Sequence, residues 1–164
     1  MRDIIVRPAA WDDLQAIVDI TNHYIRTSTC TMKEREEDLD AARERFPLRG
    51  ERYPLLVAEI GKEVVGWGDL TAHSERTAYR FTVHDAVYVR DDMRRQGIGT
   101  VILNALISAA KGLGYHSMIA VIAAPQTPSI GLHHKLGFRD VAHLEQVGFK
   151  FEQWVDVMNL QLMF

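Results

Sequence analysis

The stretch that decides the fold is Val87-Tyr88-Val89-Arg90-Asp91-Asp92-Met93-Arg94-Arg95-Gln96-Gly97-Ile98-Gly99-Thr100. An apolar run typical of a β-strand passes through a charged turn into Arg-x-x-Gly-x-Gly, and an apolar, helix-forming segment follows at 101–107. The pattern therefore predicts a strand, a tight loop and a helix N-terminus. Such a terminus carries unpaired backbone N–H groups and a partial positive charge. Because Gly97 and Gly99 have no Cβ, a ligand can approach the backbone, and we expect a phosphate or pyrophosphate site.

Two common phosphate-binding motifs are absent from this stretch. A P-loop would require Gly-Lys-Ser/Thr at its end, whereas Gly99 is followed by Thr100 and Val101. The dinucleotide fingerprint would require a third glycine where Ile102 stands. What remains is Arg-x-x-Gly-x-Gly after an apolar strand. It resembles the acetyl-CoA pyrophosphate loop of the GNAT superfamily of N-acetyltransferases.

A second segment strengthens this resemblance. The run Pro128 to Phe138, Pro-Ser-Ile-Gly-Leu-His-His-Lys-Leu-Gly-Phe, is similar to the second cofactor helix of the superfamily, which ends in Leu-Gly-Phe and turns into a strand. Gly137 fits the position just after a helix, where a left-handed conformation is common. The two segments, in this order and at this separation, point to the GNAT fold and to acetyl-CoA as co-substrate.

Length and composition limit the class of protein. The chain has 164 residues, 47% of them apolar, so we expect a single domain over residues 1–164. The net charge of −3 indicates no basic surface for nucleic acid. No apolar run suits a membrane span and residues 1–3 begin no signal-peptide pattern, so we expect no membrane association and a cytoplasmic location. Cys30 is the only cysteine and the histidines lack metal-type spacing, so no disulfide and no metal are expected.

Hydrophobic periodicity predicts, in order, a strand, two helices, three strands, a helix, a strand, a helix and two strands. Pro8 should end the first strand, Pro47 should stop the second helix, and Gly61-Lys62 should form a tight hairpin. The fold class is α/β, with a mixed central sheet of about seven strands and about four helices on both faces. This is also the element order of the GNAT fold. The expected strands are 4–7, 54–60, 63–70, 80–89, 117–123, 140–150 and 153–162, and the expected helices are 11–24, 39–46, 99–112 and 128–136.

Segments outside the cofactor loop narrow the resemblance. They are 21–25, 27–29, 76–79, 87–89 and 148–157, and all are similar to the phosphinothricin acetyltransferase family. That family also includes acetyltransferases of methionine sulfoximine and methionine sulfone. The resemblance covers nearly the whole chain. It implies direct transfer of acetyl from acetyl-CoA to the α-amine of a small amino-acid-like substrate, and it implies a homodimer.

The same resemblance implies which residues contact acetyl-CoA. The loop from Arg94 to Thr100 matches the pyrophosphate site, and Val87 to Val89 match the strand whose backbone pairs with the pantetheine arm. Gln126 stands where the family has Asn before the second cofactor helix. The expected cofactor-binding residues are Val87, Tyr88, Val89, Arg94, Arg95, Gln96, Gly97, Ile98, Gly99, Thr100, Gln126, Ser129 and His133.

Four residues match positions of the family's substrate pocket: Met32, Arg76, Tyr79 and Val121. Arg76 falls where the family places a contact to the substrate carboxylate, and a guanidinium can form two parallel N–H···O bonds with such a group. Taken without the resemblance, Arg76 reads as a solvated loop cation. Met32 replaces the family's aromatic residue, and a flexible thioether fills a pocket differently from a ring.

The catalytic position departs from the family pattern. The family's proposed general base is an acidic residue, usually Glu, and here that position holds His84, followed by Asp85. An ammonium must lose a proton before it attacks a thioester, and an unperturbed histidine has a suitable pKa. We therefore expect His84 as the base, with Asp85 in reserve; on a regular strand the two point to opposite faces. A packing role for His84 and a water chain in place of a side-chain base stay open.

The leaving thiol needs a second group. His133 occupies the place where the wider superfamily often has a Tyr that protonates the CoA thiolate. A catalytic or thiol-contacting role and a structural role are both open for His133. A backbone N–H at Val87 to Val89 is the expected donor to the developing oxyanion.

Two alternative functions remain. One is a GNAT enzyme for another amine, such as a polyamine, an aminoglycoside or a protein N-terminus, for which a carboxylate-rich acceptor site would be expected. The other is a non-catalytic acetyl-CoA-binding module, because the family's acidic base is replaced by His84.

Overall fold

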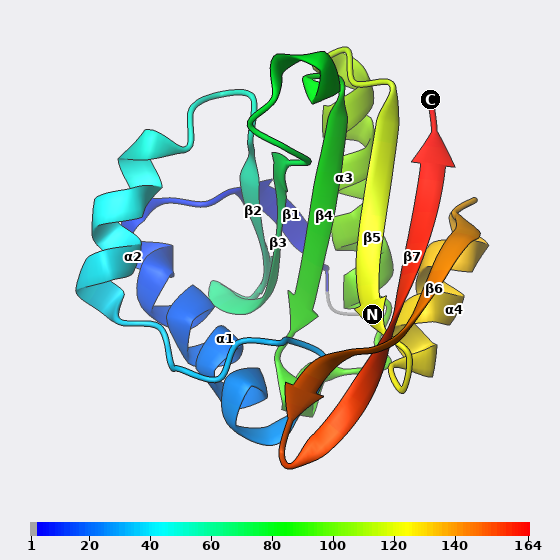
Figure 1. Cartoon of the computed structure of the whole chain (residues 1–164). Coiled ribbons are helices and arrows are strands. Elements are labelled where there is room, and N and C mark those ends of the chain that lie inside the picture. Colours follow the sequence, from blue (N-terminus) through cyan, green and yellow to red (C-terminus); the bar gives the residue numbers. More distant parts are fainter. Residues whose placement is uncertain (1–2) are drawn as a thin grey trace.

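Seven apolar segments pair into one sheet in the order β1-β2-β3-β4-β5-β7-β6 (Figure 1). The computed structural model describes residues 3–164; the sequence-based statement about a signal peptide rests partly on Met1 and Arg2, which lie outside the described residues. All neighbouring strands are antiparallel except β4 and β5, which run parallel. The strands are β1 (Ile5–Pro8), β2 (Leu55–Ile60), β3 (Glu63–Ala72), β4 (Thr82–Val89), β5 (Ser117–Ala123), β6 (Arg139–Lys150) and β7 (Gln153–Met163).

The element order predicted from the sequence is confirmed, and so is the mixed sheet of seven strands with four helices. The helices are α1 (Leu14–Thr27), α2 (Leu39–Arg45), α3 (Ile98–Gly112) and α4 (Thr127–Lys135). The turn between β2 and β3 is the predicted tight hairpin, with positive φ at Gly61 and Lys62. No helix in the described part of the chain is long and apolar enough to cross a membrane.

The boundaries differ from the sequence prediction at both prolines. The sequence predicts that the first strand ends at residue 7, whereas Pro8 is itself the last residue of β1, in register with Leu56. A proline is tolerated there because β1 is an edge strand and needs no second ladder of hydrogen bonds. Pro47 does not end the helical conformation, because a 3-10 turn from Phe46 to Leu48 follows α2 directly.

Side-chain alternation divides the core into two layers. Val57 of β2 and Trp67 of β3 face α1, where they pack with Leu14 and Ile17. The alternate positions of these strands face α3 and join a larger cluster around Leu106. Figure 1 shows α1 and α2 on one side of the sheet and α3 on the other. The period of two along each strand therefore commits α1 and α3 to opposite faces.

The packing of α3 on the sheet requires a glycine at position 68. A Cβ built on Gly68 would lie 2.6 Å from Cγ2 of Ile102, 2.9 Å from the carbonyl oxygen of Ala86 and 3.0 Å from Cδ1 of Leu106. Only a residue without a side chain allows α3 to approach β3 this closely. This contact fixes the height of α3 above the sheet and with it the position of the helix N-terminus.

β4 and β5 separate after a short pairing. Their register covers only Thr82 to Asp85 against Ser117 to Ala120. β4 stays paired with β3 as far as Val89, and β5 stays paired with β7 as far as Ala123. One edge of β4 beyond Asp85 therefore has no strand partner, and Figure 1 shows the ends of both strands pointing toward this opening.

The peptide groups of this open edge can be assigned. The N–H of Arg90 donates to Val65 on β3 at 2.8 Å. Because successive peptide groups of a strand point to opposite edges, the N–H groups of Val89 and Val87 point away from β3. Both lie in the segment Val87 to Val89, where the sequence predicts one backbone N–H as the donor to the oxyanion, and that role stays a prediction.

Replacing Gly68 by alanine should destabilise the fold, because the new methyl group would collide with Ile102 and with the backbone at Ala86. We expect a loss of about 1–3 kcal/mol in the free energy of unfolding, the usual cost of overpacking. Urea denaturation measures it. The matched control is Gly112→Ala in α3, where a Cβ meets nothing within 4 Å. The control should be neutral or gain about 0.5–1 kcal/mol; equal stability of both variants would contradict the close contact between α3 and β3.

Candidate active site

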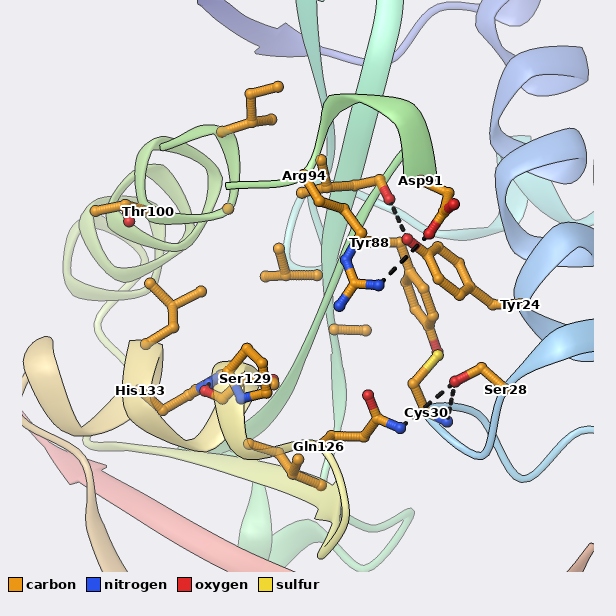
Figure 2. Close-up of a pocket in the computed structure, with 18 of the residues that line it drawn as sticks. Tyr24, Ser28, Cys30, Tyr88, Asp91, Arg94, Thr100, Gln126, Ser129 and His133 are labelled. Atoms are coloured by element: carbon orange, nitrogen blue, oxygen red, sulfur yellow. Dashed lines mark hydrogen bonds and ion pairs between the residues drawn. The ribbon is translucent and has the colours of Figure 1, made fainter. Parts of the chain in front are cut away.

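A cavity of about 810 Å³ lies where β4 and β5 separate. One wall comes from the end of α1 and the loop after it, and the opposite wall from the end of β5 and from α4 (Figure 2). Between them lie β4 and the first turn of α3. The cavity therefore touches both the open edge of β4 and the helix N-terminus that the sequence predicts as an anion site.

The N-terminus of α3 is uncapped. Gly97 is the residue that precedes the helix, with φ at 82°, and no side chain caps the first turn. The first helical hydrogen bond runs from Val101 to the carbonyl of Gly97, so the N–H groups of Ile98, Gly99 and Thr100 have no helical partner. In Figure 2 Arg94 extends into the cavity, where it pairs with Asp91 at 3.4 Å. Three free N–H donors and a cation suit an anionic ligand such as a pyrophosphate.

Tyr24 connects α1 to the open edge of β4. Its hydroxyl donates a hydrogen bond of 2.5 Å to the carbonyl oxygen of Val89 (Figure 2). Burial raises the pKa of Tyr24 to about 12, so the hydroxyl stays protonated and keeps donating. Burial also raises the pKa of Tyr88 to about 12. The edge of β4 is therefore held in place by α1 on one side while its N–H groups face the cavity.

Asp85 and His133 form a buried pair at the base of the opening. Nε2 of His133 lies 2.9 Å from Oδ2 of Asp85, and the two side chains are only 4% and 2% exposed. Nδ1 of His133 lies 2.7 Å from the carbonyl oxygen of Ser129 on the preceding turn of α4. The second carboxylate oxygen of Asp85 has no hydrogen-bond partner within residues 3–164. Both residues line the cavity.

The partners of His133 determine its protonation. A backbone carbonyl accepts only, so Nδ1 of His133 must carry a hydrogen that it donates to Ser129. Nε2 faces a carboxylate oxygen, so a further proton lies between His133 and Asp85. Burial alone would lower the pKa of His133, but the hydrogen bond and charge of Asp85, together with the carbonyl of Ser129, raise it. The two partners of His133 therefore place one proton between Nε2 of His133 and Oδ2 of Asp85, and both influences of Asp85 favour the protonated imidazole.

His84 lies on the opposite face of β4 from Asp85, as the strand period predicts. Its Nε2 lies 2.7 Å from Nδ1 of His73, and the two rings are stacked. Tyr79 packs edge-on against His73 at a ring separation of 5.1 Å. Burial, and then the charge of His73, lower the pKa of His84, whereas Asp85 acts in the opposite direction. His84 is therefore neutral at pH 7.

The cavity brings together most of the residues expected from the sequence. Every expected cofactor-binding residue lines it except Gln96, whose amide nitrogen lies 3.9 Å from the sulfur of Met93. Of the expected catalytic residues, Asp85 and His133 line the cavity and His84 does not. Of the expected substrate-binding residues, only Val121 lines it; Met32, Arg76 and Tyr79 lie outside, and their roles stay predictions.

Two departures from the family pattern have visible structural partners. Gln126 reaches across the cavity, with its amide nitrogen 3.5 Å from the hydroxyl of Ser28 and 3.4 Å from that of Thr29 (Figure 2). Met32 packs against β6, because a Cβ on Gly148 would meet its sulfur at 2.6 Å.

Sequence reasoning missed several residues that line the cavity, among them Tyr24, Ser28, Cys30 and Asp91. The only available signal was that Tyr24 and Ser28 belong to the segments similar to the family. Burial raises the pKa of the Cys30 thiol, which makes Cys30 a poor nucleophile at neutral pH.

Comparison with known proteins agrees with this geometry. Residues 17–138 match the acetyltransferase (GNAT) family. The chain is 38% identical over 159 residues to an L-methionine sulfoximine/L-methionine sulfone acetyltransferase of Pseudomonas aeruginosa. The aligned residues cover 96% of this chain and 92% of that relative. It is 35% identical over 156 residues to a phosphinothricin N-acetyltransferase of Streptomyces viridochromogenes. The aligned residues cover 95% of this chain and 85% of that relative.

A solved structure shows the same arrangement of elements. It is that of a putative acetyltransferase from Salmonella typhimurium with its cofactor acetyl-CoA. The two structures superpose with a TM-score of 0.94 at 34% sequence identity, covering 98% of this chain and 93% of the other.

The Asp85–His133 pair should make stability depend on pH in a definite direction. Because the pKa of His133 is raised in the fold, the pair stabilises fully below the ordinary histidine pKa of about 6.5, and this contribution is lost as the pH rises through the raised value. Asp85→Asn removes the negative partner. The free energy of unfolding of the wild type should therefore exceed that of the variant by more at about pH 6 than at about pH 9. Urea denaturation at both pH values measures the difference.

A matched control is available on the same helix. His134 pairs with Asp140 at 2.7 Å, but both side chains are exposed, and such pairs contribute little to stability. Asp140→Asn should show almost no pH-dependent loss. A loss for Asp85→Asn that is the same at both pH values would contradict a raised pKa of His133.

Proposed function

This chain belongs to the acetyltransferase (GNAT) family, and on that premise we propose that it transfers acetyl from acetyl-CoA to the α-amine of a small amino acid or analogue. Phosphinothricin, methionine sulfoximine and methionine sulfone are the leading acceptors. Support comes from the similarity of 35–38% to enzymes named for these acceptors. The family resemblance expected from the Arg94–Thr100 loop and the Leu-Gly-Phe helix is thereby confirmed.

The observation that carries the proposal is the uncapped N-terminus of α3 beside the open edge of β4. The N–H groups of Ile98, Gly99 and Thr100 would hold the pyrophosphate, with Arg94 as a counter-charge. The free N–H groups of Val87 and Val89 would pair with the pantetheine arm and donate to the developing negative charge on the carbonyl oxygen. When bound, acetyl-CoA supplies an acetyl group activated as a thioester. The residues present fit this ligand.

Two proton transfers are needed, and each face of β4 offers a group for one of them. His84 is neutral at pH 7, because its pKa is lowered mainly by burial, so it can accept the proton that the acceptor's ammonium must lose. On the other face the Asp85–His133 pair holds a proton at the base of the opening. That proton would pass to the sulfur as the carbon–sulfur bond breaks, leaving a neutral imidazole beside the carboxylate.

The alternatives differ in what they require. A polyamine or aminoglycoside enzyme would need a carboxylate-rich acceptor side, whereas Arg76 begins the 3-10 turn η3 (Thr77–Tyr79) whose Tyr79 packs on His73. An arginine there favours an acceptor with a carboxylate. A non-catalytic binder would have no use for a buried proton donor beside the cavity. The Asp85–His133 pair therefore favours an enzyme.

We further propose that a second copy of the chain packs on the β6–β7 hairpin, as the family resemblance implies. Large apolar side chains of this hairpin are exposed, namely Val141, Leu144, Val147, Phe149, Phe151 and Trp154. A patch of this kind is typical of protein–protein contacts. The hairpin is also tied to the cavity wall, because buried Lys150 donates to the carbonyl oxygens of Ser28 and Thr31 at 2.7 and 2.8 Å.

The purified enzyme should release free CoA thiol from acetyl-CoA when it is given methionine sulfone, methionine sulfoximine or phosphinothricin. Spermidine and an aminoglycoside should give little release. A thiol assay measures turnover, and mass spectrometry of the product should show acetylation of the α-amine. Turnover confined to the polycations would assign the enzyme to the alternative class, and acetyl-CoA binding without any turnover would favour the binding module.

The role of the α3 N-terminus can be tested with two glycines that share a positive φ and open surroundings. Gly97→Ala should strain the loop before α3 and raise the KM for acetyl-CoA several-fold, whereas Gly50→Ala, at a site away from the cavity, should not. An unchanged KM in Gly97→Ala would remove this loop from the proposed site.

Trp154→Glu should convert the proposed dimer to a monomer, because a charge would replace a ring that is 62% exposed on the hairpin. Leu48→Glu is the control, since Leu48 is 81% exposed outside the hairpin. Light scattering coupled to gel filtration gives the mass of each. A wild type that is monomeric at micromolar concentration would overturn this part of the proposal.

A further inference from the structure

His73 and His84 form a stacked, hydrogen-bonded pair on the face of β4 away from Asp85. Their ring centroids are 5.0 Å apart, with 18° between the ring planes, and Nδ1 of His73 lies 2.7 Å from Nε2 of His84. His73 is exposed at the end of β3, and His84 is half-buried in β4. We refer to these two residues as the histidine pair.

The hydrogen bond restricts the tautomers of the histidine pair. Between two neutral imidazoles one ring nitrogen donates a hydrogen and the other accepts with a lone pair. If Nε2 of His84 donates, Nδ1 of His84 keeps a free lone pair and can accept a proton. If His73 donates instead, the hydrogen of His84 sits on Nδ1 and its only lone pair is occupied. Only the first arrangement leaves His84 able to act as a base.

We propose that His73 is a positioning residue for the transfer reaction: it accepts the Nε2–H of His84, which leaves Nδ1 of His84 free to take the proton of the acceptor amine, and it passes a proton on to solvent. This inference rests on the proposed function and adds to it a residue outside the cavity lining. Within residues 3–164, Nδ1 of His84 has no hydrogen-bond partner, which is the condition that the proposal requires.

The histidine pair stands next to the opening between β4 and β5. Ala86 follows His84 by two residues on the same face of β4, and Ala86 lines the cavity. On β5, Ile119 is in register with His84, and the next residue, Ala120, also lines the cavity. The strands part directly beyond this point. His84 is therefore the last residue on the α1 face of β4 before the strands part, and it is followed on that face by Ala86 in the cavity wall.

The proton transfers balance without any additional reactant. The nitrogen–hydrogen bond of the acceptor's ammonium breaks and a bond from that hydrogen to Nδ1 of His84 forms. The Nε2 proton of His84 moves to Nδ1 of His73, and the Nε2 proton of His73 passes to water, which reaches this exposed ring. One proton leaves the amine and one proton enters solvent. Exchange of both rings with water then restores the starting tautomers.

The charges around the histidine pair suit a base that is neutral at pH 7. Burial is the main cause that lowers the pKa of His84, the charge of His73 adds to it, and Asp85 opposes both. Asp69 lies on the same face of the neighbouring strand β3, where Arg49 binds it at 2.8 Å. Tyr79 from η3 contributes an uncharged ring, and β5 places only Ile119 beside His84.

Kinetics of two His73 variants test the proposal. His73→Phe keeps a ring for stacking but cannot accept a hydrogen bond, so kcat should fall by about tenfold to a hundredfold with an unchanged KM for acetyl-CoA. His73→Asn places an amide oxygen near the position of Nδ1 and should retain part of the lost kcat, because it can orient His84 without relaying a proton. His116→Phe, at another exposed histidine, is the control and should match the wild type.

The outcomes of these experiments distinguish a failure of the proposed function from a failure of the proposed role of His73. If the wild type releases no thiol with any acceptor, the proposed function fails. If the wild type is active and His73→Phe keeps its kcat and its pH profile, the histidine pair alone fails. A fall in kcat that His73→Asn does not relieve at all would also contradict the orienting role of His73.

Nuclear magnetic resonance of the ligand-free protein gives a readout that does not depend on activity. Ring nitrogen shifts should show neutral His84 protonated on Nε2, and the titrations of His73 and His84 should share two linked midpoints, as expected for two groups that exchange one proton. In His73→Phe the resonances of His84 should follow a single midpoint. Neutral His84 protonated on Nδ1, or two independent titrations in the wild type, would overturn the proposal.

Discussion

The rest of the structure depends on one interruption of backbone pairing, the separation of β4 from β5 after Asp85. Unpaired backbone groups are costly when they are removed from water, so such a gap persists only where each strand keeps another neighbour. β3 holds β4 as far as Val89, and β7 holds β5 as far as Ala123. The gap then places free N–H groups of β4 beside the uncapped N-terminus of α3. The backbone alone thus builds a surface for an extended, anionic ligand.

The period of two along β4 explains how two adjacent polar residues on one strand can have separate partners. His84 and Asp85 are adjacent, so they project to opposite faces and meet different elements. Asp85 meets His133 of α4, and His84 meets His73 at the end of β3. Asp85, one position beyond the place where the family resemblance expects an acidic residue, therefore lies on the other face of the sheet. On the face of β4 that His84 occupies, a second histidine, His73, lies beside it.

The sequence predicted the fold and the glycine-containing loop before α3 because both are encoded locally. The Gly-x-Gly before α3 and the alternating strands are patterns that neighbouring residues set by themselves. The contacts within the candidate site are not local: His133 meets Asp85 across 48 positions, and Tyr24 meets Val89 across 65. Periodicity indicates the face to which a side chain points, but only the register of strands and the packing of helices decide what it meets there. For the same reason the end of β1 at Pro8 depended on its place at the sheet edge.

The two pairs on β4 are also linked by charge. The carboxylate of Asp85 opposes the other influences on His84 and favours its protonation, but the imidazolium of His133 lies 2.9 Å from that carboxylate and offsets much of its field. While His133 is charged, His84 stays neutral and able to accept. Once His133 has given up its proton, the uncompensated carboxylate favours a proton on His84. In the proposed reaction the amine must lose its proton before the sulfur can leave, so the amine meets the first of these two states, in which His84 is neutral and able to accept.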